Sequence, residues 1–346
     1  MTFHVLALSG GGIRGLHAVH IVDMIEQQLG NPIARHFDLI CGTSIGGILA
    51  LGLALERPAS ELKTLLVDKR KQVFARPLSR RLLSWIRAKH PVEPLRAELE
   101  RIFGNATLED LLHPVVIPAV DASAGSAVMF KTPHDPHFVI DRHRQATEVA
   151  LATAAAPTYF PVFRAPDARL FVDGGLIANA PGLCGLHEAE IFFKRSTPEI
   201  HILAIGTASV GRNVRSHGGT LWNLLSALPG CRNALASAAL DMGVLRWGSR
   251  VFDLTISAQE SLVHNLVKHR LCDRYTVVDS KIDTARSRDV ECLNAVSEAA
   301  VDTLLAAAAK TGQEFIGSAE FRKFAAHKAP SVDFRSNALA ASEIPA

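Results

Sequence analysis

Short apolar runs alternate with stretches of helical periodicity in the first third of the chain. Phe3–Leu8 and Phe37–Cys41 are short and apolar, which predicts two buried strands. Leu16–Leu29 repeats apolar residues at helical spacing, and Ile45–Leu55 predicts a helix that is buried on most sides. Strand, helix, strand, helix in this order is typical of a parallel sheet covered by helices on both faces. The pattern therefore predicts an α/β fold.

The same patterns continue along the rest of the chain. Further strands are expected at Val115–Ala119, Ala127–Lys131, Leu170–Val172, His201–Ile205 and Arg274–Val278. Further helices are expected at Glu148–Ala156, Leu221–Leu228, Ala234–Leu245 and Val290–Ala309. We find no repeat or linker, so we expect a core over residues 1–210, C-terminal α/β additions over 211–325 that pack on it, and a poorly ordered tail over 326–346.

Composition and charge narrow the classes of partner. Hydrophobic residues make up 48% and charged residues 21%, which is typical of a globular protein. The net charge of +3 is too small to favour a nucleic acid as the partner. Five dispersed cysteines without paired spacing indicate reduced thiols and neither a disulfide framework nor a metal site. No apolar stretch approaches the roughly 20 residues that a membrane-spanning helix needs, so we expect a cytoplasmic protein without a signal peptide.

The strongest candidate for chemistry is Gly42-Thr43-Ser44-Ile45-Gly46, a G-x-S-x-G sequence between a predicted strand and a predicted helix. A serine on such a sharp turn has its hydroxyl exposed above the sheet, and the small residues on either side avoid a clash with it. The following helix N-terminus favours negative charge beside the hydroxyl. A turn with an ordinary helix-capping serine is the alternative, but the strand before and the helix after favour a nucleophile.

A glycine-rich loop follows the first predicted strand and contains Gly10, Gly11, Gly12, Ile13, Arg14 and Gly15. Its spacing also satisfies G-x-G-x-x-G, the fingerprint of dinucleotide binding. That hypothesis requires an acid at the end of the second strand, whereas Asp38 begins this strand and Cys41 ends it. Consecutive backbone N–H groups, with Arg14 adding positive charge, could instead bind an oxyanion. The loop precedes Ser44 by one strand–helix unit, so both turns should emerge side by side, which favours the oxyanion hypothesis.

A third candidate is Asp173-Gly174-Gly175, directly after the predicted strand Leu170–Val172. This tripeptide alone is typical of a turn. Together with the serine turn and the glycine loop, it places a carboxylate at the end of a strand where close approach is possible. Asp173 is therefore the candidate base.

These three segments, in this order, closely resemble the patatin-like phospholipase family. That family combines a G-G-G-x-R-G loop, a G-x-S-x-G turn and a D-G-[GA] motif. Two further stretches resemble it: the sequence AAAPTYFP at 154–161, and DGGLIANAP at 173–181. The resemblance covers about residues 3–210. It implies a three-layer α/β/α fold with a mainly parallel central sheet and C-terminal helical additions.

The resemblance also implies roles for the motif residues. Ser44 would be the nucleophile, Asp173 its base, and Gly11, Gly12 and neighbouring amides the oxyanion hole, in a catalytic dyad without histidine. The activity would be hydrolysis of phospholipid acyl esters, without a metal or an organic cofactor. The residues alone leave a Ser–Asp–His triad open, because the order Ser, Asp, His is the usual one in α/β-hydrolases. The candidates for such a histidine are His187, His201, His217, His264, His269 and His327.

A basic segment follows the predicted core helices. Between Lys69 and Lys89 there are eight Lys or Arg residues and no acid, and apolar residues including Trp85 are interleaved with them. This pattern suits an anionic membrane surface. A solvated helix with one buried stripe, or a site for an anionic regulator, fits the pattern as well.

Within the family, the N-terminal half most resembles the cyclic-nucleotide-activated phospholipase effectors of bacterial antiphage signalling systems. The stretches SGGGIRGLHAVHIVDMIEQQLG and FDLICGTSIGGILALGLALERPASELK carry this resemblance. It implies activation by a cyclic dinucleotide similar to cGAMP from a partner synthase, and membrane phospholipids as substrate. It also implies a peripheral location at the inner membrane when active, and assembly of several copies on activation. A constitutive esterase of the same family is the alternative, and a dinucleotide-binding oxidoreductase is a more distant one.

Overall fold

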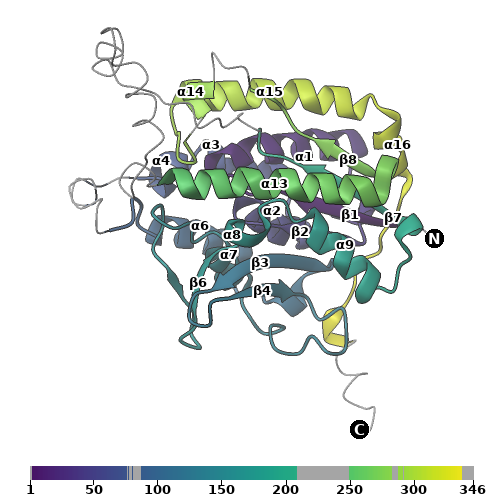
Figure 1. The fold of residues 1–346 in the computed structure, drawn as a ribbon, viewed down its shortest axis with the longest axis horizontal. Helices are drawn as coiled ribbons and strands as arrows, with labels where there is room; N and C mark the ends of the chain where they lie inside the picture. Colours follow the sequence, from purple (N-terminus) through teal and green to yellow (C-terminus); the bar gives the residue numbers. More distant parts are fainter. Residues whose placement is uncertain are drawn as a thin grey trace, which may run out of the picture.

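The computed structural model describes residues 2–75, 77, 80, 87–208, 249–282, 287–290 and 292–336. A mixed, eight-stranded sheet passes through these residues in the order β5–β6–β3–β2–β1–β7–β8, and β4 pairs with β3 (Figure 1). The strands are β1 (Phe3–Leu8), β2 (Leu39–Gly42), β3 (Val115–Asp121), β4 (Ser126–Lys131), β5 (Phe163–Arg164), β6 (Leu170–Asp173), β7 (Ile200–Ile205) and β8 (Tyr275–Val278).

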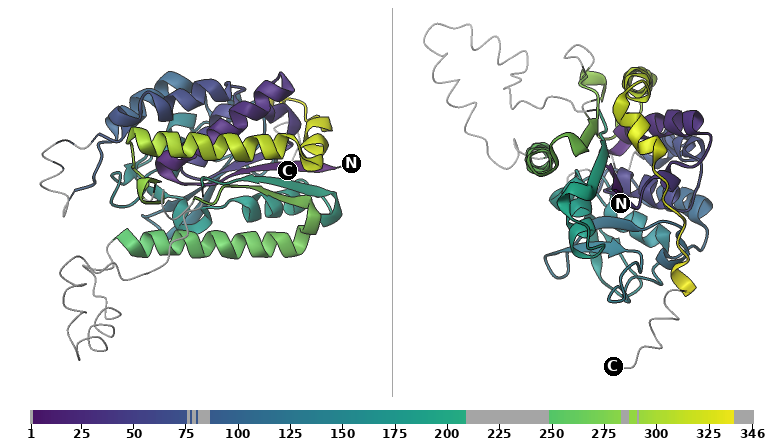
Figure 2. Two further views of the ribbon diagram at one scale, coloured as in Figure 1. Left: turned by 90° about the horizontal axis from the view of Figure 1, so that it is seen from above. Right: turned by 90° about the vertical axis from the view of Figure 1, so that its right-hand side faces the viewer.

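Helices cover both faces of this sheet. The α-helices of the described residues are α1 (Gly15–Leu29), α2 (Ile45–Ala54), α3 (Ala59–Val67), α4 (Arg70–Val73), α6 (Glu93–Phe103), α7 (Ala146–Thr153), α8 (Gly175–Ala178), α9 (Gly182–Ile191), α13 (Ser249–Leu271), α14 (Ser287–Val290), α15 (Glu298–Ile316) and α16 (Ala319–Ala326). The views in Figure 2 show the sheet between a layer that contains α1 and α15 and a layer that contains α13. The predicted three-layer α/β/α fold is confirmed.

The pattern within β1 explains the layers. Side chains alternate across a strand, so Leu6 and Leu8 join the apolar cluster under α1, α2 and α15, whereas Val5 and Ala7 join the cluster under α9 and α13. Parallel pairing of β1 with β2 and β7, of β2 with β3, and of β7 with β8 forms the centre of the sheet. The prediction of a mainly parallel central sheet is confirmed, and antiparallel pairs occur around β3 and β6.

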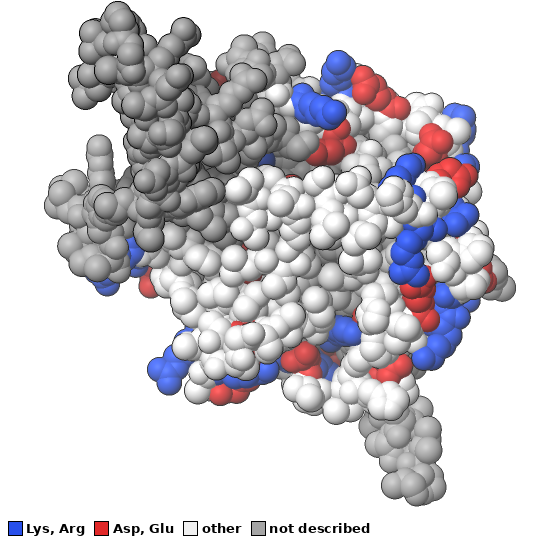
Figure 3. Space-filling model, in the orientation of Figure 1, with Lys and Arg blue, Asp and Glu red and all other residues white. Residues whose placement is uncertain are grey.

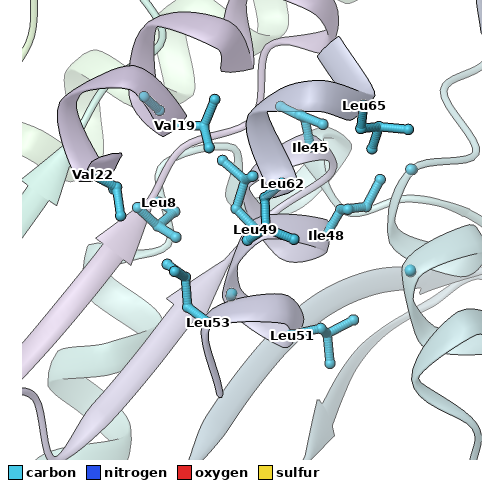
Figure 4. Close-up of a cluster of buried hydrophobic side chains, with 14 of the residues drawn as sticks. Leu8, Val19, Val22, Ile45, Ile48, Leu49, Leu51, Leu53, Leu62 and Leu65 are labelled. Atoms are coloured by element: carbon cyan, nitrogen blue, oxygen red, sulfur yellow. The ribbon is translucent and has the colours of Figure 1, made fainter. Parts of the chain in front are cut away.

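The helix α2 lies in the middle of the larger core cluster. All ten of its residues are buried, and Figure 4 shows Ile45, Leu49 and Leu53 among side chains from β1, α1 and α3. Burial of one such aliphatic side chain contributes roughly 1.5–3 kcal/mol. Because α2 begins directly after Ser44, this packing fixes the position of that serine.

The C-terminal region differs in part from the expectation. The strand predicted at Arg274–Val278 is confirmed as β8. The helix predicted at Val290–Ala309 is wrong in its start, because α14 ends at Val290 and α15 begins only at Glu298. The Ser297 hydroxyl accepts a hydrogen bond from the Ala300 N–H, and such a cap sets the start of a helix. The long helix α13 was not predicted. The helices expected at 221–228 and 234–245 lie outside the described residues.

The described part of the expected tail lies along the core. The Ala329 N–H donates to the Arg35 carbonyl at 2.8 Å, and the Val332 N–H donates to the Leu112 carbonyl at 2.8 Å. Phe334 is 1% exposed. These contacts hold residues 329–334 against the catalytic half of the chain.

Candidate active site

The three predicted motifs meet at one edge of the sheet. β1 and β2 are parallel neighbours, so the glycine loop after Leu8 and the serine turn after Gly42 leave the sheet side by side. β6 runs in the opposite direction, and its last residue, Asp173, pairs with Ala119 near the carboxyl end of β3. An antiparallel strand therefore brings the aspartate to the level of Ser44. The structure thus brings all three motifs together, as the sequence predicts.

Ser44 occupies a sharp turn between β2 and α2. Its backbone has φ 55° and ψ −124°, a conformation that costs free energy for a residue with a side chain. The turn requires very close approach of backbone on both sides. A Cβ on Gly42 would lie 2.1 Å from the Gly46 carbonyl oxygen, and a Cβ on Gly46 would lie 2.2 Å from the Leu8 carbonyl oxygen. The G-x-S-x-G spacing is therefore required by the sterics of this turn.

Gly46→Ala is expected to destabilise the fold by about 3 kcal/mol or more, because the new methyl group must displace the backbone at the end of β1. Urea denaturation measures this loss. Gly317→Ala is the matched control, since its Cβ would make only ordinary contacts with the Gln313 and Glu314 carbonyl oxygens, 3.5 Å away or more. An unchanged denaturation midpoint for Gly46→Ala would contradict this account of the turn.

Ser44 and Asp173 are directly hydrogen-bonded. The Ser44 hydroxyl donates to Asp173 Oδ2 at 2.7 Å, and the Gly175 N–H donates to Asp173 Oδ1 at 2.6 Å. Ser44 is 9% exposed and Asp173 is 1% exposed. The second hydrogen bond holds the carboxylate in the orientation in which Oδ2 faces the serine.

The environment of Asp173 changes its acidity. Burial disfavours the charged carboxylate and raises the pKa of Asp173 to about 7, while the hydrogen bonds from Ser44 and Gly175 oppose this shift. A carboxylate with an ordinary pKa is a weak base at neutral pH. A base with a pKa close to the working pH is the most effective one in proton transfer, so burial gives Asp173 the basicity that this chemistry needs.

The amides of the glycine loop are not equivalent. The Gly10 N–H donates to the Asn179 carbonyl, the Arg14 N–H to the Gly11 carbonyl, and the Gly15 N–H to carbonyls within the loop. Among the described residues, none accepts a hydrogen bond from the N–H of Gly11 or Gly12. Of the predicted oxyanion loop, these two amides remain available to a ligand, and Gly10, Arg14 and Gly15 support the loop's shape.

The turn at Ser44 offers one more donor. The N–H of Ile45, the first residue of α2, has no acceptor among the described residues, as is usual for the first turn of a helix. The Ser44 N–H is different, because it donates to the Thr153 hydroxyl at 3.0 Å, and that hydroxyl donates to the Pro118 carbonyl. Thr43 donates its hydroxyl to the Ala178 carbonyl at 2.5 Å. The hydroxyls of Thr43 and Thr153 therefore hold the turn in place.

Two polar residues that the sequence did not assign to the site hold the glycine loop. The hydroxyl of Thr207, two residues after β7, donates to the Gly10 carbonyl at 2.9 Å. The Asn179 side-chain amide donates to the same carbonyl at 3.3 Å. Asn179 lies in the stretch 173–181 that resembles the family, which is the feature that could have identified it. Thr207 lies in no motif that we recognised.

Ser44 and Asp173 open into an apolar cavity with an empty volume of about 750 Å³, which includes open solvent. Gly11, Gly12 and Ile45 line it as well. Most of the other lining side chains are apolar: Ile48, Leu65, Leu66, Val73, Phe74, Leu95, Tyr159, Phe160, Ile256 and Leu293. The site therefore joins a polar catalytic corner to a space suited to hydrocarbon.

The structure also places the other sequence candidates. No described histidine lines this cavity or bonds to Ser44 or Asp173. His264 bonds to Tyr275 and His327 bonds to Asp38, while His217 lies outside the described residues. Within the described ranges, no group of three or more His, Cys, Asp or Glu side chains could hold a metal ion.

Several cations of the basic segment between Lys69 and Lys89 have partners. Lys69 pairs with Glu98, and Lys71 and Arg70 pair with Glu298. Lys89 lies over the Tyr159 ring, 3.9 Å from its centroid. Residues 81–86, which include Trp85, lie outside the described residues. Membrane docking by this segment therefore stays a prediction.

Comparison with known proteins identifies the family. The model of the patatin-like phospholipase family matches residues 6–182. A protein from Pseudomonas aeruginosa named cGAMP-activated phospholipase is 45% identical over 336 residues, which cover 96% of this chain and 95% of that protein. Proteins of the same name from Escherichia coli and Vibrio cholerae are 36% and 31% identical; each match covers 84% of this chain, and 83% and 85% of those proteins. The chain thus belongs to the patatin-like phospholipase family.

Proposed function

We propose that this protein is a phospholipase of the A type that hydrolyses acyl esters through a Ser44–Asp173 dyad. The observation that carries the proposal is the 2.7 Å hydrogen bond between Ser44 and a buried Asp173 at the wall of an apolar cavity. The family assignment supports the same reaction. Relatives that match 84% to 96% of this chain are named phospholipases.

The mechanism follows from the contacts of the two residues. Asp173 accepts the hydroxyl proton as Ser44 Oγ attacks the ester carbonyl, and the amides of Gly11, Gly12 and Ile45 are the candidate donors to the oxyanion that forms. Asp173 then gives the proton to the departing alkoxide, which leaves as lysophospholipid. Water attacks the acyl-enzyme while Asp173 accepts its proton. That proton returns to Ser44 as the fatty acid is released.

The cavity supports a lipid acyl chain as the substrate group. Its walls offer branched aliphatic side chains from α2, α3, α4 and α6, and the aromatic rings of Phe74, Tyr159 and Phe160 from the loops. An acyl chain therefore gains the free energy of burying apolar surface there. No helix among the described residues is long and apolar enough to cross a membrane. From the apolar cavity and the family assignment, we infer that the enzyme takes phospholipid from the membrane surface.

The test is mass spectrometry of the products from vesicles of mixed phospholipids. We expect free fatty acid and lysophospholipid in equal amounts, and a fluorophosphonate should attach to Ser44. Binding of vesicles without any release of fatty acid, even with cyclic dinucleotides present, would contradict the proposal. The position of the cleaved chain follows from the lysophospholipid isomer.

The activity is expected to rise with pH and to reach half of its maximum near pH 7, because only ionised Asp173 accepts the serine proton. Stability should change in the opposite direction. The folded-state pKa lies above the ordinary value of 3.8, so the folded protein favours the protonated group, and this stabilisation is lost as the pH rises from about 4 through about 7. The pH profile for a soluble ester measures the activity. The urea midpoints of wild type and Asp173→Asn, compared across the same pH range, measure the stability. If the activity reached half of its maximum near pH 4 instead, the assignment of Asp173 as a base with a raised pKa would be contradicted.

We propose further that a cyclic dinucleotide of the cGAMP class activates the enzyme. The support is the name shared by relatives that match 84% to 96% of this chain at 31% to 45% identity. Such matches extend beyond residue 182, where the family model ends, and therefore include part of the C-terminal region. A partner synthase would supply the nucleotide, and antiphage defence would be the setting.

A further inference from the structure

The helix α13 contacts the loop that carries Asp173. Gln259 Oε1 accepts a hydrogen bond from the Asn179 N–H at 2.5 Å, and Gln259 Nε2 donates to the Leu176 carbonyl at 3.2 Å. Glu260 Oε1 accepts a hydrogen bond from Asn179 Nδ2 at 2.5 Å. Two consecutive side chains of α13 therefore bind the backbone and the side chain of the same asparagine. At least 80 residues of sequence separate the two sides of this contact.

Asn179 in turn joins the two catalytic loops. It exchanges hydrogen bonds with Gly10, since the Gly10 N–H donates to the Asn179 carbonyl and Asn179 Nδ2 donates to the Gly10 carbonyl. Its Oδ1 packs so closely that a Cβ on Gly10 would lie 2.2 Å from it. Gly10 in turn packs against Ser44, because a Cβ added to Gly10 would lie only 3.2 Å from the Ser44 Cβ. The position of Asn179 therefore determines where the glycine loop lies relative to the nucleophile.

Glu260 determines the orientation of this amide. A carboxylate only accepts hydrogen bonds, so the Asn179 NH₂ group must point to Glu260 and Oδ1 must point to the glycine loop. Glu260 is the only Asp, Glu, Lys or Arg from Leu254 to Val267. Figure 3 shows the described surface over α13 as largely uncharged, and leucines such as Leu262 are exposed there. The one charge of this stretch is thus directed at the active-site loops.

The helix is itself anchored to the core. Val263, Val267 and Leu271 are buried in the apolar cluster that lies under α9 and α13. This places Gln259 and Glu260 on a rigid element, whereas the segment that they hold is the short helix α8 and the loop after it. A rigid support around loop-borne catalytic groups is what precise geometry requires.

We propose that Gln259 and Glu260 are positioning residues, which hold Asn179 so that the Gly11 and Gly12 amides face the oxyanion. The proposal rests on the proposed acyl hydrolase function. It assigns to α13, outside the segment that the family model matches, control over the rate of the chemical step. Substrate affinity should depend on it much less, because the cavity walls come mainly from other helices.

The test compares Gln259→Ala/Glu260→Ala with Glu260→Gln, in the full-length protein with cGAMP present. For a soluble short-chain ester, we expect the double variant to lose about 10- to 100-fold in kcat, less than the 10²–10³-fold typical of deleting an oxyanion donor, with KM changed less than about twofold. Glu260→Gln keeps an acceptor oxygen and should retain most of kcat. Ser261→Ala, an exposed neighbour on α13, is the matched control and should equal wild type.

Hydrogen exchange gives a measurement that does not depend on activity. Amides of residues 9–15 and 174–179 should exchange faster in the double variant, and at the wild-type rate in Glu260→Gln and Ser261→Ala. The proposal would be overturned if the double variant kept the kcat and the exchange rates of wild type. It would also be overturned if Glu260→Gln lost as much kcat as the double variant. Wild type without turnover or fluorophosphonate labelling would instead overturn the proposed function, while exchange would still decide whether Gln259 and Glu260 hold the loops.

Discussion

Ser44→Ala is expected to lower fatty-acid release by at least about a thousandfold, and Asp173→Asn by a similar factor. Each variant removes one member of a hydrogen-bonded pair that acts as a unit, and such losses usually cost several powers of ten in rate. Neither substitution changes the volume of the side chain by much, so both variants should still fold. The measurement is fatty-acid release from vesicles at matched protein concentration.

The two variants differ in a way that separates chemistry from stability. Asparagine cannot become charged, so Asp173→Asn avoids burying a carboxylate and should be at least as stable as wild type at pH 8. Both variants should lose fluorophosphonate labelling, Ser44→Ala because the nucleophile is absent and Asp173→Asn because it is not activated. Ser60→Ala, an exposed serine on α3, serves as the control for both. Turnover near the wild-type rate in pure Ser44→Ala would refute the assignment of the nucleophile.

Addition of cGAMP is expected to raise the activity by about a hundredfold. An enzyme that hydrolyses the cell's own membrane lipids would be toxic without control, so its active state should be rare at rest. A change in the active fraction from about 1% to about 99% requires roughly 5.5 kcal/mol of differential binding to the two states. Two phosphates and two bases of one ligand offer enough contacts for this difference if the binding site forms fully only in the active state.

The titration follows fatty-acid release at a fixed enzyme concentration against cGAMP, related cyclic dinucleotides and linear pGpA as the matched control. Described contacts offer a route from the C-terminal region to the active site, since Leu293 O accepts a hydrogen bond from the Ile13 N–H in the glycine loop. Full activity without nucleotide, and no response to any member of the panel, would refute activation and leave the hydrolase proposal intact.

The sequence alone predicted the fold class and the three motifs because each depends on local physics. The periodicity of Phe3–Leu8 and Ile45–Leu55 follows from burial on a strand and on a helix. The glycines around Ser44 follow from a turn in which backbone atoms approach closely. A local requirement leaves a local pattern, and that is why the motifs could be recognised before the fold was described.

Other features depend on residues far apart in the sequence and leave no such pattern. The acidity of Asp173 arises from complete burial by surrounding elements, and the same tripeptide at a surface turn would keep an ordinary pKa. Only the folded chain shows that the amides of Gly11 and Gly12 stay available while Gly10 and Gly15 use theirs within the protein. Four glycines and an arginine in one loop look equivalent until their partners are known.

The C-terminal region shows the same division. The strand at Tyr275–Val278 has a short apolar pattern and was predicted, whereas the start of α15 depends on the Ser297 cap and was placed wrongly. Gln259 and Glu260 have no motif, because their importance comes from the position of Asn179 about 80 residues earlier. The sequence by itself determined the fold class and the candidate nucleophile and base. Tertiary structure alone decided the acidity of that base, the available amides and the support of α13, since burial and hydrogen-bond partners exist only once distant segments have packed together.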